Sequence, residues 1–119
     1  MKKTLVIGAS ENPARYSNMA IKRLVASGHP VVAIGQKVGT VGEVSIGTEK
    51  TQFSDIDTVT LYLNPSRQQE YYQYILSLNP KRIIFNPGTE NDDFQSLANE
   101  KGIQTLEACT LVMLSTHQF

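Results

Sequence analysis

The sequence has little cysteine, little histidine, no tryptophan and no net charge. One cysteine among 119 residues excludes an internal disulfide framework and a zinc site built from several cysteines. The two histidines, His29 and His117, are too few to favour a metal centre of the His-rich kind. Eleven Lys and Arg balance eleven Asp and Glu, so there is no global basic field to bind nucleic acid or an acidic membrane.

Long hydrophobic runs are also missing. No apolar stretch approaches the roughly 20 residues that span a bilayer. The basic start Met1–Lys3 precedes only the short run Leu5–Ile7, which does not make a signal peptide. What the chain does have is 40% hydrophobic residues in 13.2 kDa, enough for a core without disulfides or metal. We therefore expect a cytoplasmic protein with a single domain across residues 1–119.

Five short apolar runs predict five strands. They are rich in Val, Ile, Leu, Thr and Phe and mostly lack an alternation of polar and apolar residues, which is typical of parallel strands buried on both faces. The five runs are Thr4–Ile7, Val31–Ile34, Thr58–Leu63, Arg82–Phe85 and Ile103–Leu106.

Most of these runs are separated by segments whose apolar residues recur at helical spacing. The first helix is predicted over Met19–Ser27, with Ser17 as its N-cap. A capping box over Ser66–Gln69 predicts a second helix that runs toward residue 78. A third follows over residues 94–101. The alternation of strands and helices predicts right-handed crossovers and a covered parallel sheet.

The fold expected from this alternation is a three-layer, doubly wound α/β fold of the Rossmann-like type, with about five strands. We predict the strand order 3-2-1-4-5, with the switch point between strands 1 and 4. Residues 36–57 are the exception to the alternation. Because Gly, Thr and Ser are frequent there, we expect a loop with at most a strand fragment or a short helix.

Small, polar or turn-forming residues follow every predicted strand. In doubly wound sheets, ligands bind outside the carboxyl ends of the strands, so these residues are candidates for a binding site. Every strand end also needs turn residues, which is a purely structural explanation of the same pattern. The segments are Gly8-Ala9-Ser10, Gly35-Gln36-Lys37, Asn64-Pro65, Asn86-Pro87-Gly88 and Ala108-Cys109-Thr110.

The loop after the first strand is the most informative of these segments. Gly8 allows a close turn, Ser10 and Ser17 offer hydroxyl groups, and Arg15 offers a planar donor for phosphate. The free N–H groups of the following helix would favour an anion. The loop has only one of the three glycines of a dinucleotide fingerprint, and no Gly-Lys-Ser/Thr follows as in a P-loop.

The end of the second strand indicates the kind of nucleotide. Sites for NAD usually place Asp or Glu there to hold the ribose hydroxyl, whereas this chain has Lys37. A lysine suits a ligand with an additional phosphate on the adenosine ribose, such as coenzyme A (CoA) or NADP. An ordinary loop lysine is the alternative explanation.

These segments together resemble small stand-alone CoA-binding proteins, which are similar to the nucleotide-binding domain of succinyl-CoA synthetase alpha subunits. The resemblance implies that the first loop holds the CoA diphosphate, that Lys37 meets the 3′-phosphate, and that the loops after strands three and four border the nucleoside and the pantetheine arm. The cofactor-binding residues it implies are Gly8, Ala9, Ser10, Arg15, Ser17, Gly35, Lys37, Asn64, Pro65, Asn86 and Gly88. The synthetase's phosphohistidine has no counterpart at His29 or His117.

Two further features have alternative explanations. Cys109 is either a buried structural cysteine or a thiol near the CoA thiol. The tyrosines Tyr71, Tyr72 and Tyr74 lie on different faces of one predicted crossover helix and cannot all face the core. We therefore expect some of them on the surface, where a homodimer contact could form.

The sequence thus favours a protein that binds CoA or acyl-CoA without catalysis, since no set of nucleophile, base and orienting group can be named. A subunit related to NADP-linked oxidoreductases is a second hypothesis. A third is an interaction module that supplies the nucleotide domain of a larger ligase. The expected partner is a small-molecule nucleotide cofactor, with a homodimer left open and no metal, nucleic acid or membrane involved.

Overall fold

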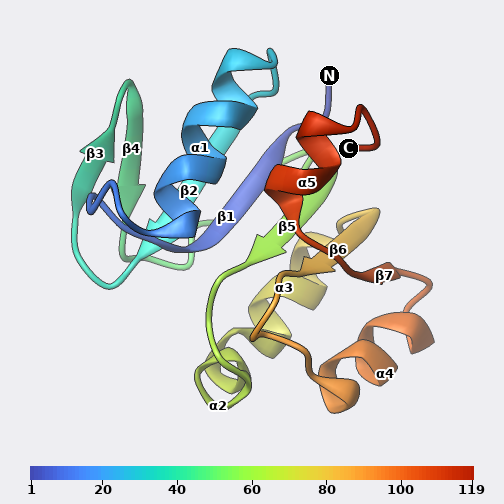
Figure 1. Cartoon of the computed structure of the whole chain (residues 1–119). Helices are drawn as coiled ribbons and strands as arrows, with labels where there is room; N and C mark the ends of the chain where they lie inside the picture. Colours follow the sequence, from blue (N-terminus) through green and yellow to red (C-terminus); the bar gives the residue numbers. More distant parts are fainter.

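A seven-stranded sheet forms the centre of the computed structural model, which describes residues 1–119 (Figure 1). Its strand order is β3-β4-β2-β1-β5-β6-β7, and every neighbouring pair is parallel except β3 and β4. The predicted class, an α/β fold with a parallel sheet of the Rossmann-like type, is therefore confirmed. The strands are β1 (Thr4–Ala9), β2 (Val31–Gly35), β3 (Gly39–Val41), β4 (Val44–Gly47), β5 (Thr58–Leu61), β6 (Arg82–Phe85) and β7 (Gln104–Glu107).

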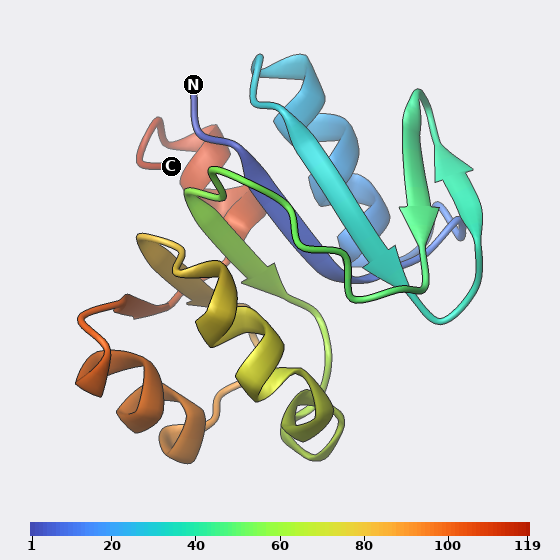
Figure 2. The same ribbon diagram turned by 180° about the vertical axis from the view of Figure 1, so that it is seen from behind.

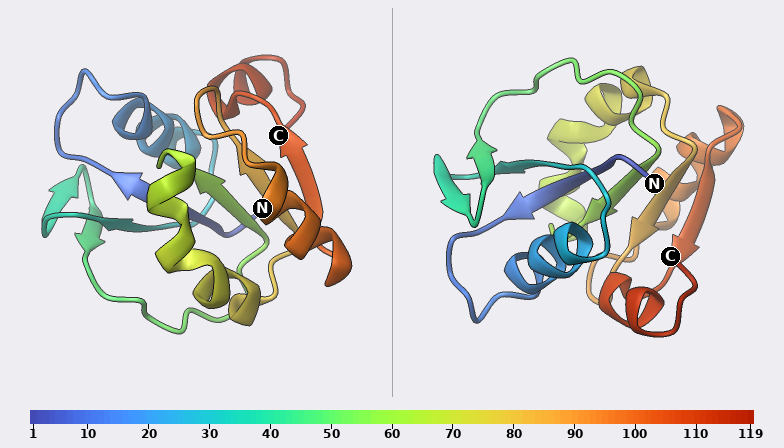
Figure 3. Two further views of the ribbon diagram at one scale, coloured as in Figure 1. Left: turned by 90° about the horizontal axis from the view of Figure 1, so that it is seen from below. Right: turned by 90° about the horizontal axis from the view of Figure 1, so that it is seen from above.

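Helices cover both faces of this sheet. Figures 2 and 3 show α1 and α5 on one side and α2, α3 and α4 on the other. None of the helices is long and apolar enough to cross a membrane. The helical segments are α1 (Tyr16–Ala26), α2 (Pro65–Gln68), a 3₁₀ turn (Gln69–Tyr71), α3 (Tyr72–Leu78), α4 (Asp92–Glu100) and α5 (Thr110–Ser115).

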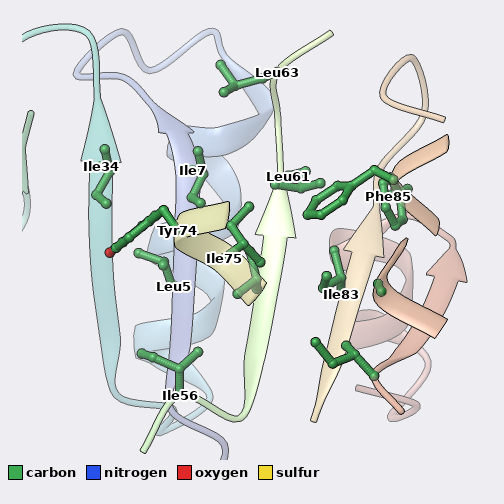
Figure 4. Close-up of a cluster of buried hydrophobic side chains, with 14 residues drawn as sticks. Leu5, Ile7, Ile34, Ile56, Leu61, Leu63, Tyr74, Ile75, Ile83 and Phe85 are labelled. Atoms are coloured by element: carbon green, nitrogen blue, oxygen red, sulfur yellow. The ribbon is translucent and has the colours of Figure 1, made fainter. Parts of the chain in front are cut away.

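The central strands are buried on both faces, which explains their unbroken apolar sequence. On β1, Leu5 and Ile7 belong to the core beneath α3 and α4, while Val6 belongs to a smaller core beneath α1 and α5. Figure 4 shows Tyr74 and Ile75 of α3 lying against the first of these cores. Fully burying an aliphatic or aromatic side chain contributes about 1.5–3 kcal/mol each, so these strands hold the sheet in place.

The predicted strand order is wrong in one respect. The third predicted strand, β5, pairs with β1 rather than with β2. The switch point consequently lies between β1 and β5, the first and third predicted strands. The reason is that β4 pairs in parallel with β2 and already occupies that edge, with Ala33 opposite Ile46.

The segment over residues 36–57 contains more structure than predicted. Its two short strands, β3 and β4, form an antiparallel hairpin in which Val41 pairs with Val44. The two residues between them form the turn, and Gly42 adopts a positive φ of 59° there, as tight hairpin turns often require. The hairpin lies beside β2, so the segment that was predicted as a loop forms one outer edge of the sheet.

The first helix begins earlier than predicted. α1 starts at Tyr16 with Arg15 as its N-cap residue, so the prediction of Ser17 as N-cap is wrong. A turn in which the Arg15 N–H donates to the Asn12 carbonyl, at 3.0 Å, leads the chain into the helix. Ser17 therefore lies inside the first turn, where it is 3% exposed.

The second helix also begins before its predicted cap. Asn64, not Ser66, is the N-cap, because its Oδ1 accepts from the Arg67 N–H at 3.0 Å. Pro65 occupies the first helical position, where its missing N–H costs nothing. The Ser66 hydroxyl instead donates to the Asn64 side chain at 2.8 Å.

The three tyrosines after β5 contact the core to different extents, and only Tyr74 is buried. Tyr74 is buried and its hydroxyl donates to the Thr51 carbonyl at 2.5 Å. Tyr72 stacks on Phe94 of α4 with ring centroids 4.4 Å apart, and Tyr71 packs against the same core. Tyr71 and Tyr72 are only half-buried, so a homodimer contact stays a prediction.

Candidate ligand-binding site

The carboxyl ends of β1, β2, β5 and β6 open into a cavity of about 670 Å³. A volume of this size is typical of sites for small molecules and cofactors. Of the eleven residues that the sequence analysis implied, eight line this cavity, namely Gly8, Ala9, Ser10, Arg15, Ser17, Lys37, Asn64 and Gly88. Gly35, Pro65 and Asn86 do not line it. The other lining residues are Glu11, Asn12, Tyr16, Gln36, Tyr62, Leu63, Arg67, Pro87 and Thr89.

Gly8 lets the first loop pass closely over the end of β5. Its φ is +94°, and a Cβ atom there would lie 3.0 Å from the backbone carbon of Tyr62. An L-residue with a side chain would be strained in this conformation, and its Cβ would press against the backbone of Tyr62. The loop is tied further by Asn18, whose side-chain amide donates to the Ser10 carbonyl at 3.0 Å.

The start of α1 presents free donors at the cavity. Arg15 makes no side-chain hydrogen bond as the cap of this helix, so the first backbone N–H groups are not satisfied by a cap. Because Tyr16 and Ser17 line the cavity, these N–H groups lie next to it. N–H groups at the start of an 11-residue helix favour an anion.

Gly35 has a packing role beneath the cavity. A Cβ atom on Gly35 would lie 2.4 Å from the carbonyl oxygen of Ala9, which is far inside the contact distance. Only glycine therefore allows the end of β2 to lie beside the end of β1 at this point. Gln36 and Lys37, which follow Gly35, reach the cavity because the strand ends meet here.

Glu11 joins the first loop to the hairpin that the sequence analysis missed. Its Oε2 accepts from the backbone N–H of Thr40 in β3 at 2.9 Å. A Cβ atom on the adjacent Gly39 would lie 2.3 Å from the Glu11 carboxyl carbon, so a larger residue there would displace the flexible end of the Glu11 side chain. The one carboxylate that lines the cavity is thus engaged in holding the hairpin against the first loop.

Three cationic side chains line the cavity, and they come from three separate segments. Arg15 precedes α1, Lys37 follows β2, and Arg67 lies in α2. Arg67 was not among the residues that the sequence analysis implied. The signal that could have found it is the spacing from Asn64, since an N-cap three residues earlier fixes the backbone of Arg67.

Asn86 lies under the cavity in a buried polar network. It is 2% exposed, and both protons of its amide are used, by the Thr60 hydroxyl at 2.6 Å and the Leu61 carbonyl at 2.9 Å. Its side-chain oxygen accepts from the Thr110 N–H at 2.9 Å. The structure therefore gives Asn86 the task of joining β5, β6 and the start of α5.

The remaining candidates differ in their surroundings. Tyr62 lines the cavity, and burial raises the pKa of its phenol to about 12, so it stays protonated at neutral pH. Cys109 is a free, half-buried cysteine that precedes α5 and does not line the cavity. No group of three or more His, Cys, Asp or Glu side chains is arranged to hold a metal ion.

Comparisons with known proteins bear on the family and on the fold. A family model described as "CoA binding domain" matches residues 2–115. A crystal structure of an uncharacterized protein is 48% identical, with a TM-score of 0.98, and covers 100% of this chain and 98% of that chain. A hypothetical protein from Pyrococcus horikoshii OT3 is 25% identical, with a TM-score of 0.87 over 97% of this chain and 82% of that chain.

A more distant structure shares the fold alone. It is that of cell-free ID.343 from Thermus thermophilus, which is 18% identical, with a TM-score of 0.86 over 99% of this chain and 90% of that chain. No curated protein matches significantly.

Proposed function

Because the chain belongs to the CoA-binding domain family, we propose that it binds coenzyme A or an acyl-CoA in the cavity at the carboxyl ends of its strands. The single observation that carries this proposal beyond the family is the charge of the cavity. Arg15, Lys37 and Arg67 face it, while the one lining carboxylate, Glu11, is engaged by the hairpin. Such a surplus of positive charge suits a ligand that carries several phosphates.

The diphosphate of the ligand fits the first loop. Arg15 and the free N–H groups at the start of α1 converge there, and both are favourable for a diphosphate. The adenosine ribose then lies toward the end of β2, where folds of this type hold it. Lys37 at this strand end supplies a cation for the 3′-phosphate of CoA.

We also propose that the domain binds its ligand without catalysing a reaction. The cavity is lined by no histidine, cysteine or aspartate. Glu11 accepts from the Thr40 N–H, and burial raises the pKa of the Tyr62 phenol to about 12, still further from neutral pH than its ordinary value of about 10. A nucleophile with an adjacent base is the usual requirement for acyl transfer, and this set of lining residues does not supply one.

The experiment that tests binding is thermal unfolding with CoA, acetyl-CoA, dephospho-CoA, NADP and NAD. At a concentration 100 times its Kd, a ligand that binds only the folded state adds about 2.7 kcal/mol. We expect stabilisation by CoA and acetyl-CoA, a weaker effect of dephospho-CoA, and no effect of NAD. Stabilisation by NADP alone would favour the oxidoreductase-like subunit instead, and no response to any nucleotide would favour the interaction module.

The absence of catalysis has its own test. Acetyl-CoA is incubated with the protein and followed by mass spectrometry over hours, with buffer alone as the control. We expect the thioester to disappear at the same rate in both. Repeated turnover by the protein would contradict the proposal that it only binds.

A further inference from the structure

Two polar side chains from distant parts of the chain meet at the cavity. Gln36 follows β2, and Arg67 lies in α2 beyond β5. The Gln36 amide satisfies both groups when its oxygen faces the guanidinium, and the oxygen then accepts from Nη1 of Arg67 at 3.0 Å and also from Nη2. Both residues line the cavity, as does Lys37, the neighbour of Gln36.

The chemistry of this contact leaves the arginine charged. A carboxylate at the end of β2 is what a dinucleotide site uses to hold a ribose hydroxyl, and here it would form an ion pair with Arg67. The amide oxygen of Gln36 is a neutral acceptor, so it holds the guanidinium without cancelling its charge. Arg67 retains further N–H donors, because a guanidinium carries five and the glutamine uses only part of them.

Arg67 is held at two points. Its backbone N–H donates to the Asn64 side chain at 3.0 Å, which fixes the first turn of α2, and its guanidinium is held by Gln36. Its side chain is half-buried. An arginine already held in place loses less conformational freedom on binding than a free one, so more of its interaction with a phosphate appears as affinity.

We propose that Arg67, positioned by Gln36, recognises the phosphate on the adenosine ribose together with Lys37, and that Gln36 determines the preference for a phosphorylated ribose over one with a free hydroxyl. This inference rests on the proposed function. The ribose phosphate is the part of the ligand concerned, rather than the diphosphate, because Gln36 and Lys37 follow β2, the strand whose end faces the adenosine ribose in this class of fold.

The test measures Kd by calorimetry for CoA and for dephospho-CoA, which lacks only the ribose phosphate. We compare the wild type with two variants, Gln36→Glu and Arg67→Lys. Gln36→Glu keeps the shape of the side chain but neutralises Arg67 and repels phosphate. Arg67→Lys keeps the charge but loses the planar fork. Arg23→Ala, which changes an exposed arginine outside the cavity, is the matched control.

We expect Gln36→Glu to weaken CoA binding about tenfold and Arg67→Lys about fivefold, as a charge-assisted contact at a partly exposed site should. Both variants should leave the Kd for dephospho-CoA within about twofold of the wild type, because that ligand carries a neutral hydroxyl in place of the phosphate. Arg23→Ala should bind both ligands as the wild type does. Thermal unfolding establishes whether each variant is folded. If one variant is not folded, the binding data of the other variant test the proposal.

The outcomes separate this inference from the proposed function. If the wild type does not bind CoA, the proposed function fails and this inference fails with it. If the wild type binds CoA but each variant changes both ligands equally, or changes neither, the assignment of Gln36 and Arg67 is overturned while the CoA site stands. Weaker binding of CoA alone supports the assignment.

Discussion

Two of the cavities in the molecule are similar in size, and their linings differ in charge. The first, at the carboxyl ends of the strands, has a volume of about 670 Å³ and contains Arg15, Lys37 and Arg67. The second has a volume of about 520 Å³ and contains Glu43 and Glu49 but no lysine or arginine. Hydrophobic residues make up 7 of its 14 lining residues, against 4 of 17 in the first cavity. Cavity size therefore does not separate the two, whereas charge favours the first cavity for the phosphorylated ligand that we propose.

One strand takes part in both cavities. The residues Val31–Ile34 of β2 line the second cavity, and Gln36 and Lys37 beyond its end line the first. Along this short stretch the sequence changes from continuously apolar to polar and cationic. The segment after β2 thus adds a cation to the first cavity, while β2 itself adds only apolar residues to the second. Gly35 lies between the two sets of lining residues.

The largest effect on this comparison should come from Gly35→Ala. Its added Cβ would lie 2.4 Å from the Ala9 carbonyl oxygen, a backbone atom that cannot move without displacing β1. We expect a loss of about 3 kcal/mol in the free energy of unfolding, measured by urea denaturation, and weaker CoA binding because the ends of β1 and β2 separate.

Gly47→Ala is the matched control for this prediction. Gly47 lines the second cavity, its φ is not positive, and a Cβ there would meet nothing within 4 Å. The free energy of unfolding should therefore change by less than about 0.5 kcal/mol, and CoA binding should not change. Equal losses of stability in the two variants would show that the close approach of β1 and β2 at Gly35 does not require glycine.

An intermediate effect is expected from removing one cation of the first cavity. Arg15→Ala should weaken the binding of CoA and of dephospho-CoA about tenfold each, because both ligands carry the diphosphate that we assign to Arg15. Calorimetry with the two ligands measures this. The same loss for both ligands distinguishes Arg15 from Gln36 and Arg67, whose variants should affect CoA alone.

The second cavity supplies the control for Arg15. Glu49→Gln removes a negative charge from its lining and should leave the Kd for CoA unchanged within about twofold. Tighter binding of CoA by Glu49→Gln, combined with no effect of Arg15→Ala, would move the ligand to the second cavity and reverse the assignment.

The sequence predicts the central strands well for a physical reason. Strands buried on both faces need continuous apolar residues, so all five runs appear as β1, β2, β5, β6 and β7 with small shifts at their ends. The first two predicted helices also end within one residue of their predicted ends, at Ala26 and Leu78. A residue with a positive φ follows each of these ends, Gly28 with +86° and Asn79 with +50°. Each of these signals depends on a residue and its immediate neighbours in the sequence, so it can be recognised without the fold.

The elements that the sequence analysis missed depend on contacts between distant segments. The β3–β4 hairpin is held by pairing with β2 and by Glu11, which lies 29 residues before Thr40. The contact between Arg67 and Gln36 likewise joins two segments that are distant in the sequence. No pattern within either segment predicts that the two segments come into contact. The strand order is wrong for the same reason, because it is decided by which strand reaches the edge of β2.

The smallest effect concerns His29, which lines the second cavity. Its Nδ1 accepts from the Lys2 N–H at 3.1 Å. Burial lowers the pKa of His29 below 6.5, with help from the positive charges of Lys2, the N-terminus and Arg82 and against the opposing effect of Asp57. The unfolded chain therefore binds a proton at a higher pH than the folded one, so the His29 contribution is complete above pH 6.5 and is lost as the pH falls through the window below it.

His29→Gln removes this titration and keeps an acceptor for the Lys2 N–H. Between pH 8 and pH 5, the free energy of unfolding of the wild type should fall more than that of the variant, and urea denaturation at several pH values measures the difference. The Kd for CoA should be the same in both proteins at every pH, because His29 lines the cavity without cations. Identical pH profiles of stability would contradict the sign argued for His29, and a change in CoA affinity would show that the two cavities are not independent.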